Sequence, residues 1–273
     1  MRAQQAHIIA ELNVCPTVDP AVEIRRRVDF LKEYAVACGS GGFVLGISGG
    51  QDSTLAGCLC RMAVTELVSA GYPARFVAVR LPYGTQRDEA DAQRALAFIQ
   101  PQETVIFNIK HSVDGLAQDY HDATRVAISD FAKGNVKARM RMIAQYALAG
   151  EHRLLVVGTD HAAEAVMGFF TKFGDGGADI LPLTGLSKRQ GRELLISLDA
   201  PPAVYTKVPT ADLLDTNPGQ SDEANLGLRY EDIDAYLEGH EVDDSVAHQI
   251  EQRFAQTRHK RAAPVSPFDN WWR

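Results

Sequence analysis

A short apolar run that passes through a glycine-rich turn into a helix constrains this chain more than any other feature. The apolar run is residues 43–45, and Leu55, Leu59 and Met62 follow the turn at the spacing of one helical face. The turn reads Gly46-Ile47-Ser48-Gly49-Gly50-Gln51-Asp52-Ser53. A buried strand that leads directly into a helix is the repeating unit of a parallel α/β sheet.

The residues of this turn suit an anion. The helix behind it offers free N–H groups and the positive end of its dipole, and Ser48 and Ser53 add hydroxyl donors. No lysine follows the second glycine, so the turn is not a phosphate loop of the Walker type. We expect a phosphate site of another kind, and the alternative is a tight turn that binds nothing.

The same turn permits a second functional hypothesis. Residues 46–50 fit G-x-S-x-G, the pattern in which a hydrolase serine stands on a sharp turn between strand and helix. Ser48 would then be the nucleophile, with Asp160 or Asp179 and His259 as its partners. Against this hypothesis, three more residues precede the helix and lengthen a turn that the chemistry requires to be sharp.

Alternating patterns along the chain predict the fold. Apolar runs at residues 76–79, 104–107 and 154–157 each follow a helical pattern. This order predicts an α/β protein with a doubly wound parallel sheet and helices on both faces. Ligands of such sheets bind beyond the carboxyl ends of the strands, where residues 81–84 and 158–164 would join the glycine-rich turn.

Several residues are expected to mark helix boundaries. Asp88 and Ser187 stand where helices begin and can cap them, and Gly71 stands where the first core helix ends. The last helical pattern is expected to end in residues 259–261.

Composition excludes several classes of partner. The 273 residues are 45% hydrophobic and 23% charged, with a net charge of -7, which argues against a basic surface for nucleic acid or membranes. No signal peptide and no apolar run of membrane length is found, so we expect a cytoplasmic protein. The cysteines form no zinc pattern and are expected to be free thiols; they are Cys15, Cys38, Cys58 and Cys60.

The turn and several later stretches resemble one family. Residues 48–53 resemble the SGGxDS signature of the ATP pyrophosphatases, enzymes that split ATP between its α and β phosphates. Residues 169–179, rich in phenylalanine and glycine, are distinctive of the ammonia-dependent NAD synthetases. The chain resembles that family from about residue 24 to residue 272. The other matching stretches are residues 81–84, 135–142, 157–164, 168–183, 210–214 and 259–261.

The resemblance implies a fold and a reaction. The fold is the Rossmann-like ATP pyrophosphatase fold, as one NAD synthetase domain over residues 1–273 in which residues 1–22 serve packing or dimer contact. In the reaction, the carboxylate of deamido-NAD attacks the α-phosphorus of ATP to give an acyl-adenylate and pyrophosphate. Ammonia then displaces AMP and forms NAD, the last step of NAD biosynthesis. No glutaminase part or nucleophilic cysteine motif is found, so free ammonia is the expected nitrogen donor unless a separate protein supplies it.

The resemblance also assigns roles to single residues. The expected ATP-binding residues are Gly46, Ile47, Ser48, Gly49, Gly50, Gln51, Asp52, Ser53, Thr159, Lys188 and Thr210. The expected Mg²⁺ ligands are Asp52 and Glu164. The expected catalytic residues are Asp52, Lys188 and Asp175, the last of which would orient ammonia or take its proton. The expected deamido-NAD ligands are Arg139, Lys172, Asp179, His259 and Lys260.

Physical chemistry supports some of these roles and leaves others open. Mg²⁺ prefers carboxylate oxygens, which agrees with Asp52 and Glu164, although both could be solvated acids at helix starts. Lys188 directly follows a cap, where the helix dipole disfavours a cation unless an anion neutralises it. Arg139 could be part of a solvated helix face, and Lys172 could extend over the core.

The resemblance further implies a homodimer whose dinucleotide site is built by both chains. Arg139 is then expected to serve the neighbouring subunit. Phe131 and Tyr34 could stack on the rings of the dinucleotide or pack in the core.

Two further hypotheses remain from the shared signature. A non-catalytic ATP-sensing module would bind ATP without forming AMP and pyrophosphate. A tRNA-modifying enzyme would need a basic groove, which this acidic chain lacks.

Overall fold

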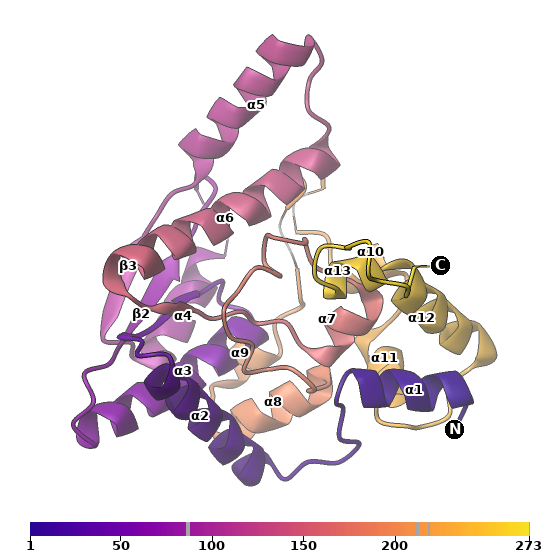
Figure 1. Cartoon of the computed structure of the whole chain (residues 1–273), viewed down its shortest axis with the longest axis horizontal. Helices are drawn as coiled ribbons and strands as arrows, with labels where there is room; N and C mark the ends of the chain where they lie inside the picture. Colours follow the sequence, from indigo (N-terminus) through magenta and orange to yellow (C-terminus); the bar gives the residue numbers. More distant parts are fainter. Residues whose placement is uncertain (86–87, 211–212, 218, 273) are drawn as a thin grey trace.

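A computed structural model describes residues 1–272 except residues 86–87, 211–212 and 218. The described strands form one parallel sheet in the order β3-β2-β1-β4 (Figure 1). Their bounds are β1 Gly42–Gly46, β2 Arg75–Arg80, β3 Glu103–Ile106 and β4 Leu155–Val156. The predicted parallel sheet is therefore confirmed.

Helices connect and cover the strands. Those of the first part of the chain are α1 (Ala3–Glu11), α2 (Pro20–Ala37), α3 (Gln51–Ser69), α4 (Glu89–Ile99), α5 (Lys110–Thr124), α6 (Asp130–His152) and α7 (Ala162–Met167). Those of the second part are α8 (Lys188–Ser197), α9 (Pro202–Tyr205), α10 (Asp222–Leu226), α11 (Tyr230–Leu237), α12 (Asp244–Gln256) and α13 (Arg258–Arg261). Among the described residues, no helix has both the length and the apolar character that a membrane crossing requires.

Side chains that alternate along the strands build a core on each face of the sheet. On one face, Phe43, Leu45 and Phe76 pack with α2, α3 and α8. On the other face, Val44 and Val77 pack with α5 and α6. Both faces are covered, as the apolar character of these strands predicts, and the doubly wound arrangement is confirmed.

A third core lies beside the sheet and joins the first helix of the chain to helices of its C-terminal part. Ile8 and Ile9 of α1 are buried together with residues of α7, α11 and α12. Figure 1 shows α1 next to these helices on the side where the C-terminal segment ends. This packing supports one of the two roles that we expected for residues 1–22, whereas a dimer contact by this stretch stays a prediction.

Of the four helix boundaries that local signals predicted, those at Ser187 and Gly71 are confirmed and the other two differ in part. Ser187 caps α8, since its Oγ accepts the N–H of Gln190, and Gly71 follows α3 with φ +82°. Asp88 occupies the cap position of α4 without a capping hydrogen bond, and its Oδ2 accepts the Lys207 ammonium at 3.0 Å. The last long helix is also shorter than its pattern predicts: α12 ends at Gln256, and α13 is a separate turn.

The strand order places a crevice beside β1. The chain runs from β1 outward to β2 and β3 and then returns to the other side of β1 as β4. Connections therefore leave β1 and β4 in opposite directions, which opens a ligand site at their carboxyl ends. The glycine-rich turn follows β1, and residues 158–164 follow β4, so both lie at this crevice.

The glycine-rich turn packs closely against α4 at Gly49. Its φ is +83°, and an added Cβ would lie 2.5 Å from the backbone nitrogen of Ala92 in α4. Gly71 has nearly the same φ, +82°, with nothing within 4 Å of such a Cβ. We expect Gly71→Ala to lower the free energy of unfolding by about 1–2 kcal/mol, the cost of the left-handed backbone, and Gly49→Ala to lower it clearly more. Urea titrations measure both losses, and equal losses would contradict the close packing of the turn on α4.

Candidate active site

A cavity of about 290 Å³ opens at the carboxyl ends of β1 and β4. The glycine-rich turn forms one wall, and the exits of β2 and β4 form its floor. One face of α6, the start of α8 and the stretch that carries Lys207, Thr210 and Leu213 complete the lining. The segments that the sequence placed together thus meet at one site.

The glycine-rich turn is held by its own hydroxyl groups. The Ser48 and Ser53 hydroxyl oxygens lie 3.0 Å apart, and the Gly50 N–H donates to Ser48 Oγ at 3.3 Å. Helix α3 begins directly afterwards at Gln51, and the first N–H groups of a helix have no partner within it. A turn with these donors that also lines a cavity fits an anion site better than a turn that binds nothing.

A buried ion pair joins the turn to α8. Lys188 Nζ lies 2.7 Å from Asp52 Oδ2, and the Gln51 side chain donates to the Lys188 carbonyl at 2.8 Å. Burial alone would raise the pKa of Asp52, but the charge of Lys188 holds this pKa below its usual range. Burial alone would likewise lower the pKa of Lys188, but Asp52 and Glu164 raise it above its usual value. Both groups are therefore charged at neutral pH.

A second carboxylate explains why a lysine can begin α8. Asp234 accepts the backbone N–H of Lys188 at 2.9 Å and that of Arg189 at 2.8 Å. Burial raises the pKa of Asp234 to about 6, although these two hydrogen bonds favour its charged form. The anions expected beside Lys188 are thus the carboxylates of Asp52 and Asp234 in this structure.

Asp52, His161 and Glu164 form a group suited to a cation. One ligand atom from each lies within 4.8 Å of the others, and His161 Nε2 is 3.6 Å from both carboxylates. Burial and the nearby Asp52 raise the pKa of Glu164 well above its usual value, so a cation between the two carboxylates would be favoured. Within the described part of the chain, neither ring nitrogen of His161 has a hydrogen-bond partner, and burial lowers the pKa of His161 to about 4.

These residues fit a magnesium ion through their carboxylate oxygens. Sequence reasoning named Asp52 and Glu164 but missed His161 as a member of the group. His161 lies three residues before Glu164, within one helical turn, and that spacing was the available signal.

Helix α6 contributes two residues that the sequence analysis did not assign. Gln145 Oε1 accepts the Gly46 N–H at 2.8 Å, which fixes the end of β1, and Arg141 Nε donates to the Leu81 carbonyl at 3.1 Å. Ala138, Arg141 and Gln145 all line the cavity. Their spacing of three and four residues marks one helical face and could have revealed them.

Lys207 is another unassigned residue in the lining. Its ammonium lies 3.0 Å from a carboxylate oxygen of Asp88 and 3.0 Å from one of Asp91, at the start of α4. Thr210, which was expected at the site, does line the cavity. Ala211 and Asp212, which belong to the matching stretch 210–214, lie outside the described residues.

The structure brings most of the expected ATP-binding residues together. Those that line the cavity are Gly46, Ile47, Ser48, Gly50, Gln51, Asp52, Ser53, Thr159, Lys188 and Thr210. Gly49 is instead the turn residue that touches α4. Glu164, the expected metal ligand, and Asp175, an expected catalytic residue, also line the cavity.

The residues expected to hold deamido-NAD lie outside this cavity lining. The Lys172 ammonium donates to the carbonyls of His259 and Ala262, and Arg139 donates to the Lys172 carbonyl at 3.3 Å. Lys260 donates to two carbonyls of the nearby loop at 2.8 Å. These four residues are thus neighbours around residues 169–179. Asp179 lies apart from them, where it accepts the Tyr146 hydroxyl and the Val156 N–H.

Two aromatic side chains were expected on the dinucleotide or in the core. Phe131 is 74% exposed and Tyr34 is 42% exposed. The prediction that these two rings pack in the core of one subunit is therefore wrong.

The serine hydrolase hypothesis finds no support in this geometry. Within the described part of the chain, no histidine lines the cavity that holds Ser48. His259 belongs to α13, and the Ser48 hydroxyl bonds to that of Ser53.

The parallel sheet, the turn after β1 and the carboxylates beside it define a nucleotide-binding enzyme of the ATP pyrophosphatase fold. The family model described as NAD synthase matches residues 23–264. The NH(3)-dependent NAD(+) synthetase of Leifsonia xyli subsp. xyli is 63% identical over 272 residues, covering 100% of this chain and 98% of that relative. The chain belongs to the NAD synthase family.

Solved structures agree with this assignment. The NAD+ synthetase from Burkholderia pseudomallei superimposes with a TM-score of 0.84 and 49% identity, covering 96% of this chain and 97% of that one. The NMN synthetase from Francisella tularensis superimposes with a TM-score of 0.80 and 33% identity, covering 93% of this chain and 100% of that one. The predicted class is confirmed: the chain is a ligase of NAD biosynthesis, and the sensing, hydrolase and tRNA hypotheses fall away.

Glu164→Gln tests the carboxylate pair without an activity assay. The folded protein raises the pKa of Glu164, so ionising this group opposes folding as the pH rises above the pKa of the unfolded chain. We expect the variant to be more stable than the wild type at about pH 8 and equally stable at about pH 4. Added Mg²⁺ should raise the melting temperature of the wild type and leave that of Glu164→Gln unchanged.

The exposed acid Glu193 of α8 supplies the matched control. Glu193→Gln removes the same charge from the surface and should show neither effect. A Mg²⁺ response of Glu164→Gln equal to that of the wild type would remove Glu164 from the metal site.

Proposed function

We propose that the cavity binds ATP and that this chain forms NAD from deamido-NAD, ATP and ammonia through an acyl-adenylate. One observation carries the proposal: the turn after β1 and the N-terminus of α3 that follows it line the cavity beside the Asp52–Lys188 ion pair. Membership of the NAD synthase family supports the same reaction.

ATP would lie with its phosphates against the turn. The N–H groups at the start of α3 and the hydroxyls of Ser48 and Ser53 are donors for them. Lys188 would turn from Asp52 to a phosphate, while Thr159 and Thr210 would contact the rest of the nucleotide. Fixed donors are well suited to the charge that develops as pyrophosphate leaves.

Asp52 and Glu164 would hold Mg²⁺. When bound, the ion would neutralise charge on the ATP phosphates. A bound cation would favour the ionised form of Glu164, whose pKa is raised without it.

Asp175 is the proposed residue for ammonia. It lines the cavity, and its Oδ1 accepts the Thr171 N–H at 3.0 Å, which fixes the carboxylate. Burial raises the pKa of Asp175, and burial with the Asp175 charge raises that of Asp160 to about 7. A carboxylate in such surroundings is suited to take the proton released when ammonia attacks the acyl-adenylate.

Deamido-NAD would bind beside residues 169–179. Arg139, Lys172, His259 and Lys260 form a basic group there, which suits the diphosphate of a dinucleotide. Asp179, on the other side of this loop, would complete the site. Arg139 would act on the dinucleotide of the neighbouring subunit.

The proposed homodimer would use the open apolar surface around α6 and β3. Phe131 is 74% exposed, Ile143 is 50% exposed and Ile106 on the edge strand β3 is 69% exposed. An edge strand with apolar side chains is a surface that a second copy would cover. We also propose a cytoplasmic location, which the four free cysteines support.

One assay tests the reaction. The purified protein should form NAD, AMP and pyrophosphate from deamido-NAD and ATP with ammonium, and should not use glutamine in its place. Nicotinate mononucleotide serves as the competing substrate, because the similar Francisella tularensis protein is an NMN synthetase. A higher kcat/KM with the mononucleotide would overturn the proposed substrate.

Asp52→Asn tests the ATP site. The change removes the charge that pairs with Lys188 at 2.7 Å and a proposed metal ligand, while the side chain keeps its shape. We expect adenylate formation to fall by about 10²-fold or more, measured as ATP–pyrophosphate exchange that depends on deamido-NAD. Exchange at the wild-type rate with Mg²⁺ present would remove Asp52 from the proposed chemistry.

Arg139→Ala tests the shared dinucleotide site. The variant should raise the KM for deamido-NAD and leave the KM for ATP unchanged, since Arg139 lies outside the cavity lining. Mixed dimers of Arg139→Ala and Asp52→Asn subunits should regain activity when the arginine acts across the interface. Mixed dimers with no more activity than the parent variants would place its action within its own subunit.

A further inference from the structure

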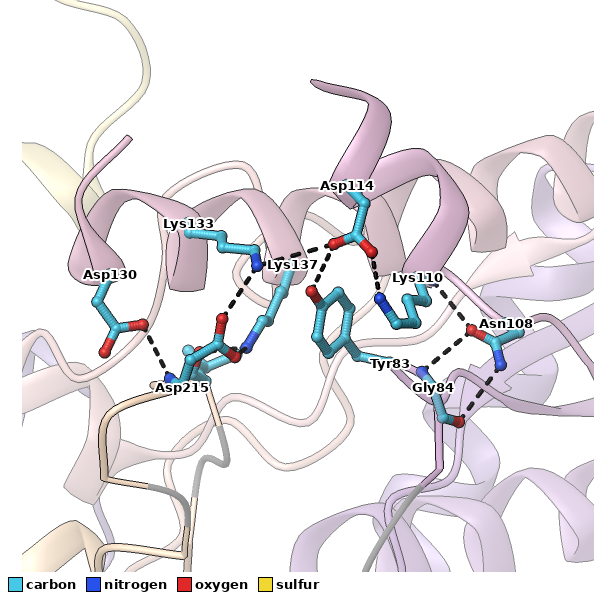
Figure 2. Close-up of polar contacts among 10 residues, drawn as sticks. Tyr83, Gly84, Asn108, Lys110, Asp114, Asp130, Lys133, Lys137 and Asp215 are labelled. Atoms are coloured by element: carbon cyan, nitrogen blue, oxygen red, sulfur yellow. Dashed lines mark hydrogen bonds and ion pairs between the residues drawn. The ribbon is translucent and has the colours of Figure 1, made fainter. Parts of the chain in front are cut away.

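Three lysines surround Tyr83, which follows the cavity-lining residue Leu81 by two positions (Figure 2). The ammonium nitrogens of Lys110, Lys133 and Lys137 lie 5.2, 5.2 and 4.4 Å from the centre of the Tyr83 ring. The Tyr83 hydroxyl donates to Asp114 of α5 at 2.5 Å. Tyr83 therefore joins the loop after β2 to both α5 and α6.

Lys137 differs from the other two lysines in its burial and its contacts. Its side chain is 3% exposed, whereas that of Lys110 is 53% exposed. Lys137 Nζ donates to the Leu213 carbonyl at 2.8 Å and to Asp215 Oδ1 at 2.5 Å. An ammonium has three donors, and among the described residues two of them bind protein oxygens while the charge faces the Tyr83 ring. Lys137 is therefore engaged mainly with the protein itself.

Residues 213–216, which Lys137 contacts, make further contacts with α6. Asp130, in the first turn of α6, accepts the N–H of Asp215 at 2.8 Å and that of Thr216 at 3.0 Å (Figure 2 shows the Asp130 and Asp215 side). Lys133 adds an ion pair to Asp215 at 3.0 Å. The helix also comes very close here, since a Cβ added to Gly134 would lie 3.3 Å from the Leu213 carbonyl oxygen.

These contacts matter for the cavity because two of its walls meet at Lys137. Leu213 and Thr210 line one wall, and Leu81, two residues before Tyr83, lines another. Lys137 binds the Leu213 carbonyl and faces the Tyr83 ring, so a single buried side chain joins both walls to α6.

We propose that Lys137 is a positioning residue for ATP: it fixes Leu213 and the residues that follow it against the loop after β2, and so sets the shape of the nucleotide cavity. Its role is to position these groups rather than to bind substrate, and it acts through Leu213 and Tyr83. The inference depends on the proposal that ATP binds in this cavity.

Lys110 offers a matched control. It lies over the same Tyr83 ring and pairs with Asp114, but its hydrogen bonds reach Asp114 and Asn108 rather than residues 213–216. Removal of the Lys110 charge therefore tests the surroundings of Tyr83 and Asp114 without removing a contact to residues 213–216. Removal of the Lys137 charge tests the tie to the Leu213 segment as well.

The experiment measures ATP binding in the absence of deamido-NAD by calorimetry, and the KM of each substrate by NAD formation. Lys137→Met should weaken ATP binding by about fivefold or more and raise the KM for ATP, with the KM for deamido-NAD within about twofold of the wild type. Lys110→Met should keep all three constants within about twofold. Asp215→Asn, at a half-exposed position that keeps Lys137 in place, should weaken ATP binding in the same direction by a smaller factor.

The outcomes separate a positioning role from a purely structural one. Unchanged ATP binding by Lys137→Met overturns the proposal, even if its melting temperature falls, and so does an equal loss for both substrates. If Lys137→Met does not fold, Asp215→Asn decides, and wild-type ATP binding by that variant overturns the proposal. Failure of the ATP site itself would appear separately, as normal pyrophosphate exchange by Asp52→Asn.

Discussion

The ion pair between Asp52 and Lys188 is the contact on which the site depends. It joins residues 136 positions apart in the chain and brings the turn after β1 against the start of α8. A buried charge is costly unless it is paired, and here each charge compensates the other while Asp234 supports the helix that carries the lysine. In the proposed reaction both groups exchange partners, Lys188 to a phosphate and Asp52 to Mg²⁺, so charge compensation continues when ATP enters.

The carboxylates around this pair show that the site is not optimised for stability. Burial and mutual repulsion raise the pKa of Glu164, and burial raises that of Asp160 to about 7. Groups arranged in this way oppose folding in the absence of ligand, which is common where a protein holds a cation or moves a proton. The two cores of the sheet and the third core beneath α1 supply the stability that the site lacks.

Different faces of helix α6 contact the end of β1, contact the Leu213 segment and face solvent. Gln145 holds the end of β1 at the cavity, and Lys137 holds the Leu213 segment and the Tyr83 ring. Phe131 and Ile143 stay exposed on the same helix, where the proposed second subunit would cover them. A contact between subunits would therefore lie on the same rigid element that shapes the nucleotide cavity.

The sequence by itself determined the strands, the turn with Gly49 and the cap at Ser187, because each depends on residues that are close in the chain. It also named Asp52 and Glu164, since a family signature preserves such residues in order. Only the tertiary structure placed His161 beside the carboxylate of Asp52 and Lys207 beside that of Asp88. Only the tertiary structure showed that the Lys172 ammonium binds backbone carbonyls. Such contacts join distant segments, and the packing of helices on the sheet decides them, which no local pattern records.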